Sequence, residues 1–397
     1  MSTSATPALF PATVAAKRSE SAVSLPWYTW LGALAVTSAS IGGAWDVSWH
    51  RSIGRDSFWT PAHMAIYLCG VLGGIIGMVL VVQATTGRDA ELRAQSISVF
   101  GLRAPLGVFL AGWGGVAMLT SAPFDNWWHN AYGLDVKIVS PPHTLLILGI
   151  RMISIGILFL VLAAMNRASA AGAANHKALQ RMFLYVAGLA VGGTMFFLQE
   201  FNEIGNLHRA LPYIATAIGV PVMLATFSQA SRYRWAATAT ASVYTLFLIA
   251  EILILPLFPA QPKLGPVFYP VTHMVPAQFP MLILAPAIAL DLLWNYTKSW
   301  KIWQIAVVSG VVFTAVLVAV EWPFAKFLLS PASRNRFFGT GYFDYLTRAN
   351  DSDVLRLFWH PTHGAELAKG LVIAVVCGMV STALGLVFGR WMRGVQR

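Results

Sequence analysis

The end of the first hydrophobic segment carries an aspartate and a histidine at a spacing that suits metal binding. Asp46 stands four residues before His50, and His63 follows after a loop and Pro61. Because residues four apart lie on one face of a helix, Asp46 and His50 can point toward the same place. A second helix that begins at Pro61 would bring His63 back across a short turn. Two imidazoles and one carboxylate suit copper, zinc or iron, and an open position on such a metal supports chemistry.

The same three residue types recur at nearly the same spacing in residues 125–143. Asp125 stands four residues before His129, and His143 follows after a loop and two prolines. A chance origin is less plausible for two such sets than for one, so the pair favours metal binding. The alternative is that these polar side chains only cap helix ends in a hydrated interface.

The composition is that of an integral membrane protein. Hydrophobic residues make up 57% of the 397 positions and charged residues 11%, and the mean hydropathy is +0.63, which is outside the range of soluble domains. We expect an all-α, polytopic helical bundle in a lipid bilayer, with about ten transmembrane helices. The expected segments are residues 27–45, 61–84, 103–122, 142–166, 179–198, 211–229, 233–257, 277–295, 302–322 and 367–389.

Lysine and arginine gather in alternate connections and thereby predict the orientation. Arg88, Arg93 and Arg103 follow the second segment, and Arg167 and Lys177 follow the fourth. Short loops rich in these residues stay in the cytoplasm. We therefore expect a multi-pass protein of the inner, cytoplasmic membrane, with both termini in the cytoplasm and both Asp/His/His sets toward the outer face. The net charge of +11 follows from this pattern, and we recognise no nucleic-acid-binding module.

The chain divides at a basic linker of small residues, 167–178. We expect residues 1–24, rich in Ala, Ser and Thr, to form a mobile cytoplasmic tail. Two membrane domains would follow, over residues 25–172 and 173–397.

Arg151 is an unusual residue inside the fourth segment, about two helical turns below His143. An unpaired cation at that depth is costly. We therefore expect Arg151 to face a wet cavity or a carboxylate, for which Asp125 and Asp135 are candidates.

Three glutamates are further candidate site residues. Glu200 and Glu203 stand with His208 at the end of the fifth segment, where they would bind metal, relay protons or simply cap and hydrate a helix end. Glu251 lies within the seventh segment, and carboxylates inside a membrane are functional candidates.

The stretch WDVSWHRSIGRDSFWTPAH at 45–63 resembles the signature of the C subunit of the copper membrane monooxygenases, the family of particulate methane monooxygenase and ammonia monooxygenase. This resemblance implies that Asp46, His50 and His63 bind copper. The other residues that fit the family pattern are Trp49, Arg55, Asp56 and Pro61.

The second set is similar to another proposed copper site of the same subunit. His129 and His143 fit that site, but Asp125 stands where the family has an asparagine. The added negative charge would change how strongly, and in which redox state, a metal is held there.

The rest of the chain is similar to the A subunit of these enzymes. FPMLILAPAIALDLLWNYTKSW at 279–300, EWP at 321–323 and the segment that ends in WHPTHG carry this similarity, and Glu251 falls where the family has an intramembrane glutamate. Residues 195–199 lack the histidines that the family has there. The resemblance implies a natural fusion, C-like up to about residue 170 and A-like afterwards.

The function implied is that of a copper-dependent membrane monooxygenase, or of a component of one. It would hydroxylate a small substrate such as methane, a short alkane or ammonia with O2, using quinol or another membrane reductant. The family also has a B subunit with soluble copper-binding domains, so the resemblance implies a separate B-like partner and an oligomer such as a trimer.

Two alternatives use the same residues differently. A metal carrier or permease would load metal at the outer-face Asp/His sets, and it would need a polar path through the membrane. A haem-b electron carrier would need histidines paired within the bilayer, whereas these stand at helix ends. The sequence does not choose among the small substrates, because helix packing makes the pocket.

Overall fold

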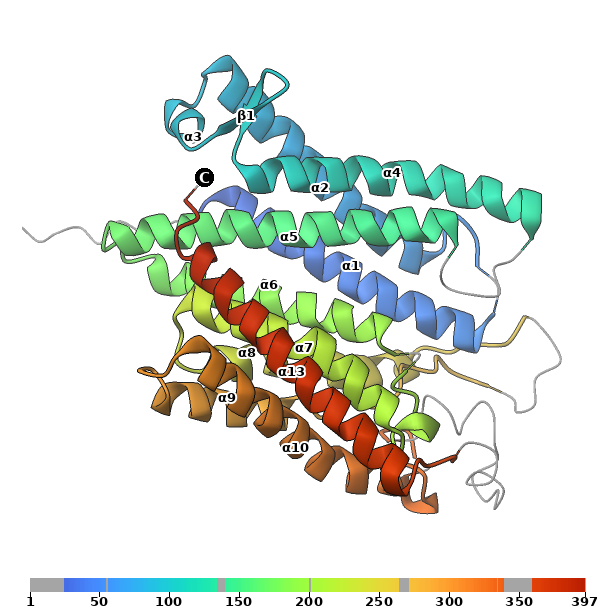
Figure 1. Ribbon diagram of the computed structural model, residues 1–397. Helices are drawn as coiled ribbons and strands as arrows, with labels where there is room; N and C mark the ends of the chain where they lie inside the picture. The colour runs from blue at the N-terminus through green and yellow to red at the C-terminus, as the bar shows by residue number, and fades with distance from the viewer. Residues whose placement is uncertain are drawn as a thin grey trace, which may run out of the picture.

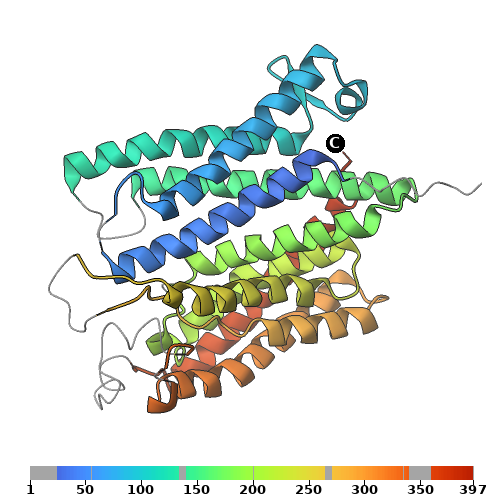
Figure 2. The same cartoon turned by 180° about the vertical axis from the view of Figure 1, so that it is seen from behind.

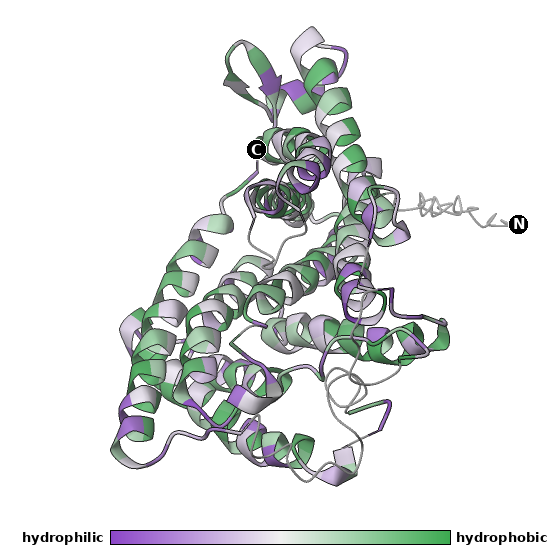
Figure 3. Ribbon diagram, turned by 90° about the vertical axis from the view of Figure 1, so that its right-hand side faces the viewer, coloured by the Kyte–Doolittle hydropathy of each residue, from purple (hydrophilic) through white to green (hydrophobic). Residues whose placement is uncertain are grey.

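The computed structural model describes residues 25–54, 56–133, 140–199, 201–263, 271–333, 335–338 and 359–396. Over these residues the chain forms a bundle of long helices that lie side by side (Figure 1). Hydrophobic residues recur along the long helices, and strongly hydrophilic residues are fewer and include many at helix ends and in connections (Figure 3). This is the all-α membrane bundle that the composition predicts.

Two helical hairpins build the first part of the bundle. Helix α1 (Trp27–Ser52) packs on α2 (Pro61–Thr86), and α4 (Leu106–Tyr132) packs on α5 (Pro141–Ala170). Both second helices begin with proline, which fits the first turn because that turn needs no amide donor. The two hairpins pack together through α2 and α4, so the loops within both hairpins lie at the same end of the bundle.

A small polar unit, absent from the sequence-based expectation, joins the two hairpins at the opposite end. It consists of α3 (Ala90–Ala94) and an antiparallel pair of strands, β1 (Ile97–Val99) and β2 (Leu102–Ala104), in which Ile97 pairs with Ala104. The expected third segment therefore begins as a strand, and its helix starts only after Pro105.

The described residues form six more long helices of the bundle: α6 (His176–Phe197), α7 (Ala210–Ser231), α8 (Ala236–Ile254), α9 (Leu284–Tyr296), α10 (Ile302–Leu328) and α13 (Gly364–Met392). Three single-turn 3-10 helices lie at Ile204–Asn206, Leu255–Leu257 and Pro331–Ser333. Helix α6 lies between α1 and α8 (Figure 2). Helix α13 crosses α7 at close range, because a Cβ atom on Gly385 or Gly389 would meet the α7 backbone.

Eight helices in the described part of the chain are long and apolar enough to cross a membrane. The other two expected segments, 27–45 and 277–295, correspond to α1 and α9. Helix α1 has 26 residues but a less apolar sequence, whereas α9 has only 13 residues. At 1.5 Å per residue, α9 spans roughly 20 Å of a hydrocarbon layer about 30 Å thick.

Helix α9 is short because residues 271–283 before it are irregular rather than helical. Two buried carboxylates satisfy backbone amides of this segment. Glu251 accepts a hydrogen bond from the amide of Ala277 at 3.3 Å, and Glu321 accepts one from the amide of Leu282 at 2.8 Å. Non-helical backbone at membrane depth needs such partners inside the protein, because lipid supplies none.

The expected boundary near residue 172 lies within continuous packing. Helices α5 and α6 contact each other across it, and one hydrophobic core includes Ile157 from the first part and Phe183 from the second. The division into two membrane domains stays a prediction.

Candidate metal centre

The first Asp/His/His set comes together at the loop of the α1–α2 hairpin. Asp46 and His50 lie on the last two turns of α1, and His63 is the third residue of α2. The Nε2 atom of His63 is 3.2 Å from Asp46 Oδ1, and that of His50 is 3.8 Å from Asp46 Oδ2. The short loop and the proline start of α2 thus place the three side chains as the spacing predicts.

Asp56 is a fourth member of this cluster, which the sequence analysis recognised only as part of the family pattern. Its Oδ2 atom is 3.1 Å from His63 Nε2 and 3.4 Å from His50 Nε2. Hydrogen bonds from His50 and His63 hold the pKa of the Asp56 carboxyl well below its usual range. Ligand atoms of Asp46, His50 and Asp56 all lie within 4.8 Å of one another. We call these residues and His63 the first cluster.

The loop also fixes which nitrogen of His63 faces the carboxylates. His63 Nδ1 is 2.9 Å from the Ser57 carbonyl oxygen, so the Nδ1–H donates there and Nε2 points inward. Ser57 is itself held, because its amide donates to Thr60 Oγ1 at 2.8 Å. An imidazole lone pair that faces two carboxylates requires a cation between them, either a proton or a metal ion. Asp46 Oδ1 is buried and lies 3.2 Å from His63 Nε2, so it is a further candidate ligand atom.

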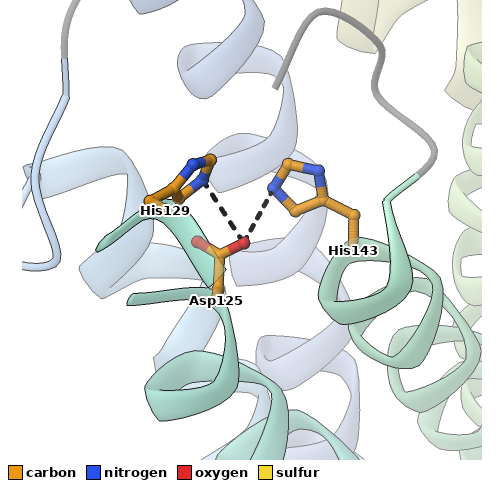
Figure 4. A group of neighbouring side chains, drawn as sticks. All are labelled: Asp125, His129 and His143. Atoms are coloured by element: carbon orange, nitrogen blue, oxygen red, sulfur yellow. Dashed lines mark ion pairs between the residues drawn. The ribbon is translucent and has the colours of Figure 1, made fainter. Parts of the chain in front are cut away.

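The second set comes together at the loop of the α4–α5 hairpin (Figure 4). Asp125 and His129 lie near the end of α4, and His143 is the third residue of α5. Asp125 Oδ1 is 3.5 Å from His129 Nε2 and 3.4 Å from His143 Nε2. We call these three residues the second cluster.

In the second cluster, as in the first, a loop carbonyl oxygen orients a histidine ring through its Nδ1 atom. His129 Nδ1 is 3.0 Å from the Gly133 carbonyl oxygen, so Nε2 again faces the carboxylate. Gly133 reaches this position with φ of 85°, a conformation that residues with a side chain rarely adopt. The clusters are neighbours, because Tyr67 on α2 lies beside His63, with ring centroids 5.9 Å apart, and within electrostatic range of Asp125.

The glutamates expected at the end of the fifth segment do not join a cluster in the described residues. Among the described residues, the groups of three ligand side chains close enough to hold a metal belong to the first and second clusters. Glu203 is exposed, and Glu200 lies outside the described residues. His208 is buried between the rings of Trp322 and Trp359, whose centroids are 4.8 and 5.7 Å from its own.

Arg151 and Glu251 line a cavity of about 170 Å³ between α1, α5, α6 and α8. Arg151 donates to the Ala190 carbonyl at 3.1 Å and lies over the Phe197 ring at 5.1 Å. Within the described part of the chain no ion pair joins Arg151 to Asp125. The other candidate partner, Asp135, lies outside the described residues.

Comparisons of the chain with protein-family models, curated proteins and solved structures find no match. The fold and the clusters therefore define a class of protein and no particular family. The class is a multi-pass α-helical membrane protein with two Asp/His clusters at one end of the bundle. The resemblance of 45–63 to a copper monooxygenase subunit stays a prediction that rests on the motif itself.

Proposed function

We propose that this chain is a membrane-bound, copper-dependent monooxygenase, or a component of one, that hydroxylates a small substrate. One observation carries the proposal. Two helical hairpins each aim two imidazole Nε2 atoms at a shared carboxylate, and both do so at the same end of the bundle. A repeated arrangement of ligand types and orientation devices is unexpected for side chains that only cap helices.

The residues fit a copper ion by the chemistry of their donors. Neutral imidazole nitrogens and carboxylate oxygens bind copper, zinc and iron, and the resemblance of the motif to a copper enzyme selects copper among them. Copper at such a site would supply O2 activation and one-electron redox chemistry. Asp46, His50, Asp56 and His63 would hold it in the first cluster.

Residues around the first cluster orient it and place aromatic rings beside it. The Ser57 carbonyl fixes the tautomer of His63, and such outer contacts tune a metal ligand. Phe58 packs against Tyr67 and Trp59, with ring centroids 5.3 and 4.9 Å apart, and forms an aromatic cover beside His63. An apolar cover of this kind favours a small, apolar or weakly polar substrate such as methane, a short alkane or ammonia.

Under this proposal the second cluster has one of two roles. Asp125, His129 and His143 would hold a second copper ion or serve the path of electrons and protons to the first. Quinol or another membrane reductant would supply the electrons, and a separate B-like subunit and an oligomer such as a trimer would complete the assembly. The clusters would then face the outer side of the inner membrane.

The test is metal content, with electron paramagnetic resonance, on protein purified in lipid after incubation with copper. We expect His50→Ala and Asp46→Ala to lose the copper of the first cluster. If the second cluster also holds copper, the wild type binds two ions per chain and His129→Ala loses one; if the second cluster serves electrons or protons, His129→Ala keeps the copper of the wild type. The matched control is His176→Ala, at the start of α6 and away from both clusters. Retention of all copper in these variants, or zinc alone in the wild type, would contradict the proposal.

A metal carrier is the alternative that one observation favours. The side chain of His50 is 49% exposed, as a loading ligand would be. Against this, α2 and α4 pack too closely below the clusters to leave a path between them, since a Cβ atom on Gly70 would lie 2.9 Å from that of Met118. Uptake of copper into proteoliposomes without substrate oxidation, abolished by His50→Ala, would establish the carrier.

A further inference from the structure

The cavity lined by Arg151 has the size and the walls of a site for a small apolar molecule. Its volume is about 170 Å³, and side chains such as Val36, Ile150 and Phe247 form much of its lining. An apolar protein cavity of about 150 Å³ is sufficient to bind benzene. The cavity shares no residue with either metal cluster, although Val47, the residue after Asp46 on α1, lines it.

Arg151 brings a positive charge to this apolar cavity. A guanidinium has five N–H donors, and in the described part of the chain Arg151 uses one of them, toward the Ala190 carbonyl. The ring of Phe197 covers one face of the guanidinium, and no carboxylate forms an ion pair with it in the described residues. A cation at membrane depth is costly unless an anion accompanies it. The remaining donors therefore favour an anionic ligand.

Neighbouring residues make room for the guanidinium and add a second donor. Gly193 leaves space beside Arg151, because a Cβ atom there would lie 2.8 Å from Arg151 Nη1. Gln199 also lines the cavity, and its Nε2 is buried without a hydrogen-bond partner among the described residues. Two donors next to apolar walls suit the oxygens of a carboxylate on a hydrocarbon body.

Two carboxylates limit the charge that the cavity accepts. Glu251 and Glu321 line it, and each directs one oxygen to a backbone amide of residues 277–282. Their proximity disfavours a ligand with two negative charges, such as a phosphate monoester.

We propose that this cavity binds a small monocarboxylate with a compact apolar body, aromatic or short-chain, whose carboxylate is held by Arg151 and Gln199. This site goes beyond the proposed oxygenase function and does not depend on a metal in either cluster.

The experiment is a 19F NMR titration of 4-fluorobenzoate at neutral pH into the full chain in nanodiscs of zwitterionic lipid, with empty nanodiscs subtracted. We expect saturable binding that weakens at least tenfold in Arg151→Met and less in Arg151→Lys, which keeps the charge but loses the fork of donors. Gly43→Leu should abolish binding, because Gly43 lines the cavity and a side chain there meets open space. The matched control is Gly74→Leu, another helical glycine with open space around its Cβ position but outside the cavity.

Two further ligands test the chemical class. We expect 4-fluorobenzyl alcohol to bind at least tenfold more weakly than 4-fluorobenzoate, and 4-fluorophenyl phosphate to compete poorly. Tighter binding of the phosphate would show that the head group is assigned wrongly. Equal binding of 4-fluorobenzoate to the wild type and Arg151→Met, or to Gly43→Leu, would overturn the site. His50→Ala should bind 4-fluorobenzoate as the wild type does, so failure of the copper proposal leaves this result unchanged.

Discussion

Asp56 gives the first cluster a second carboxylate, and this single residue separates the two clusters in charge. Asp46 and Asp56 together balance a divalent cation, whereas Asp125 alone leaves one positive charge uncompensated. A divalent metal should therefore bind more tightly at the first cluster. The i, i+4 pair and the histidine after a proline were predictable, because helix geometry fixes them. The place of Asp56 in the cluster was not, since it depends on loop contacts such as that of Ser57 with Thr60.

His208 is a buried imidazole. Burial lowers the pKa of this imidazole from its ordinary value of 6.5, and the positive charge of Lys326 contributes less to the same shift. The hydrogen bond of His208 to the Trp322 backbone opposes this shift only in part. Because the unfolded chain then binds more protons than the folded one, stability is complete above pH 6.5 and falls as the pH drops toward the lowered pKa. Each unit of lowering is worth about 1.4 kcal/mol.

We expect His208→Gln to lose much of this pH dependence. The measurement is the difference in melting temperature between pH 7.5 and pH 5.5 for protein in detergent, with His176→Gln at the partly exposed start of α6 as the matched control. If wild type and His208→Gln lost the same number of degrees on acidification, His208 would not be the group responsible.

At the scale of elements, the hairpins were predictable and the region before α9 was not. Apolar runs that begin with proline after a polar loop define α2 and α5 with few alternatives. The run at 277–295 looks equally apolar, yet its first residues are not helical. Pro276 and Pro280 disfavour helix there, and the acceptors that make a non-helical path possible come from α8 and α10, which no local pattern reveals.

Glu321 should therefore stabilise the irregular segment before α9 rather than act in chemistry. Glu321→Gln keeps a carbonyl oxygen for the Leu282 amide and should melt close to the wild type. Glu321→Leu leaves that buried amide without its acceptor, which we expect to cost about 1–3 kcal/mol. Thermal unfolding of the two variants in the same detergent makes the comparison. Equal melting of both variants would mean that the hydrogen bond contributes no stability.

At the scale of the whole molecule, composition predicted the helical bundle, which the structure confirms, whereas the orientation from charge stays a prediction. The contacts between segments that are far apart in the sequence were not predictable. Asn166 at the end of α5 donates to the carbonyls of Met392 and Val395, which ties the two expected domains together at the end opposite the clusters. Such contacts join residues more than two hundred positions apart and leave no periodic signal in the sequence.

The orientation itself is open to a direct test with single cysteines. After Cys69 and Cys377 are replaced by serine, Asn130→Cys places a thiol at the cluster end of α4, and Glu91→Cys places one on α3 at the other end. Both positions are exposed. Because Arg88, Arg93 and Arg103 surround the α3 end, we expect a membrane-impermeant maleimide to label only Asn130→Cys in right-side-out vesicles. Glu91→Cys should react only after permeabilisation.

The reverse labelling pattern would place both clusters in the cytoplasm. Metal would then have to reach them from the cytoplasmic pool, and an outer-face oxygenase would be excluded.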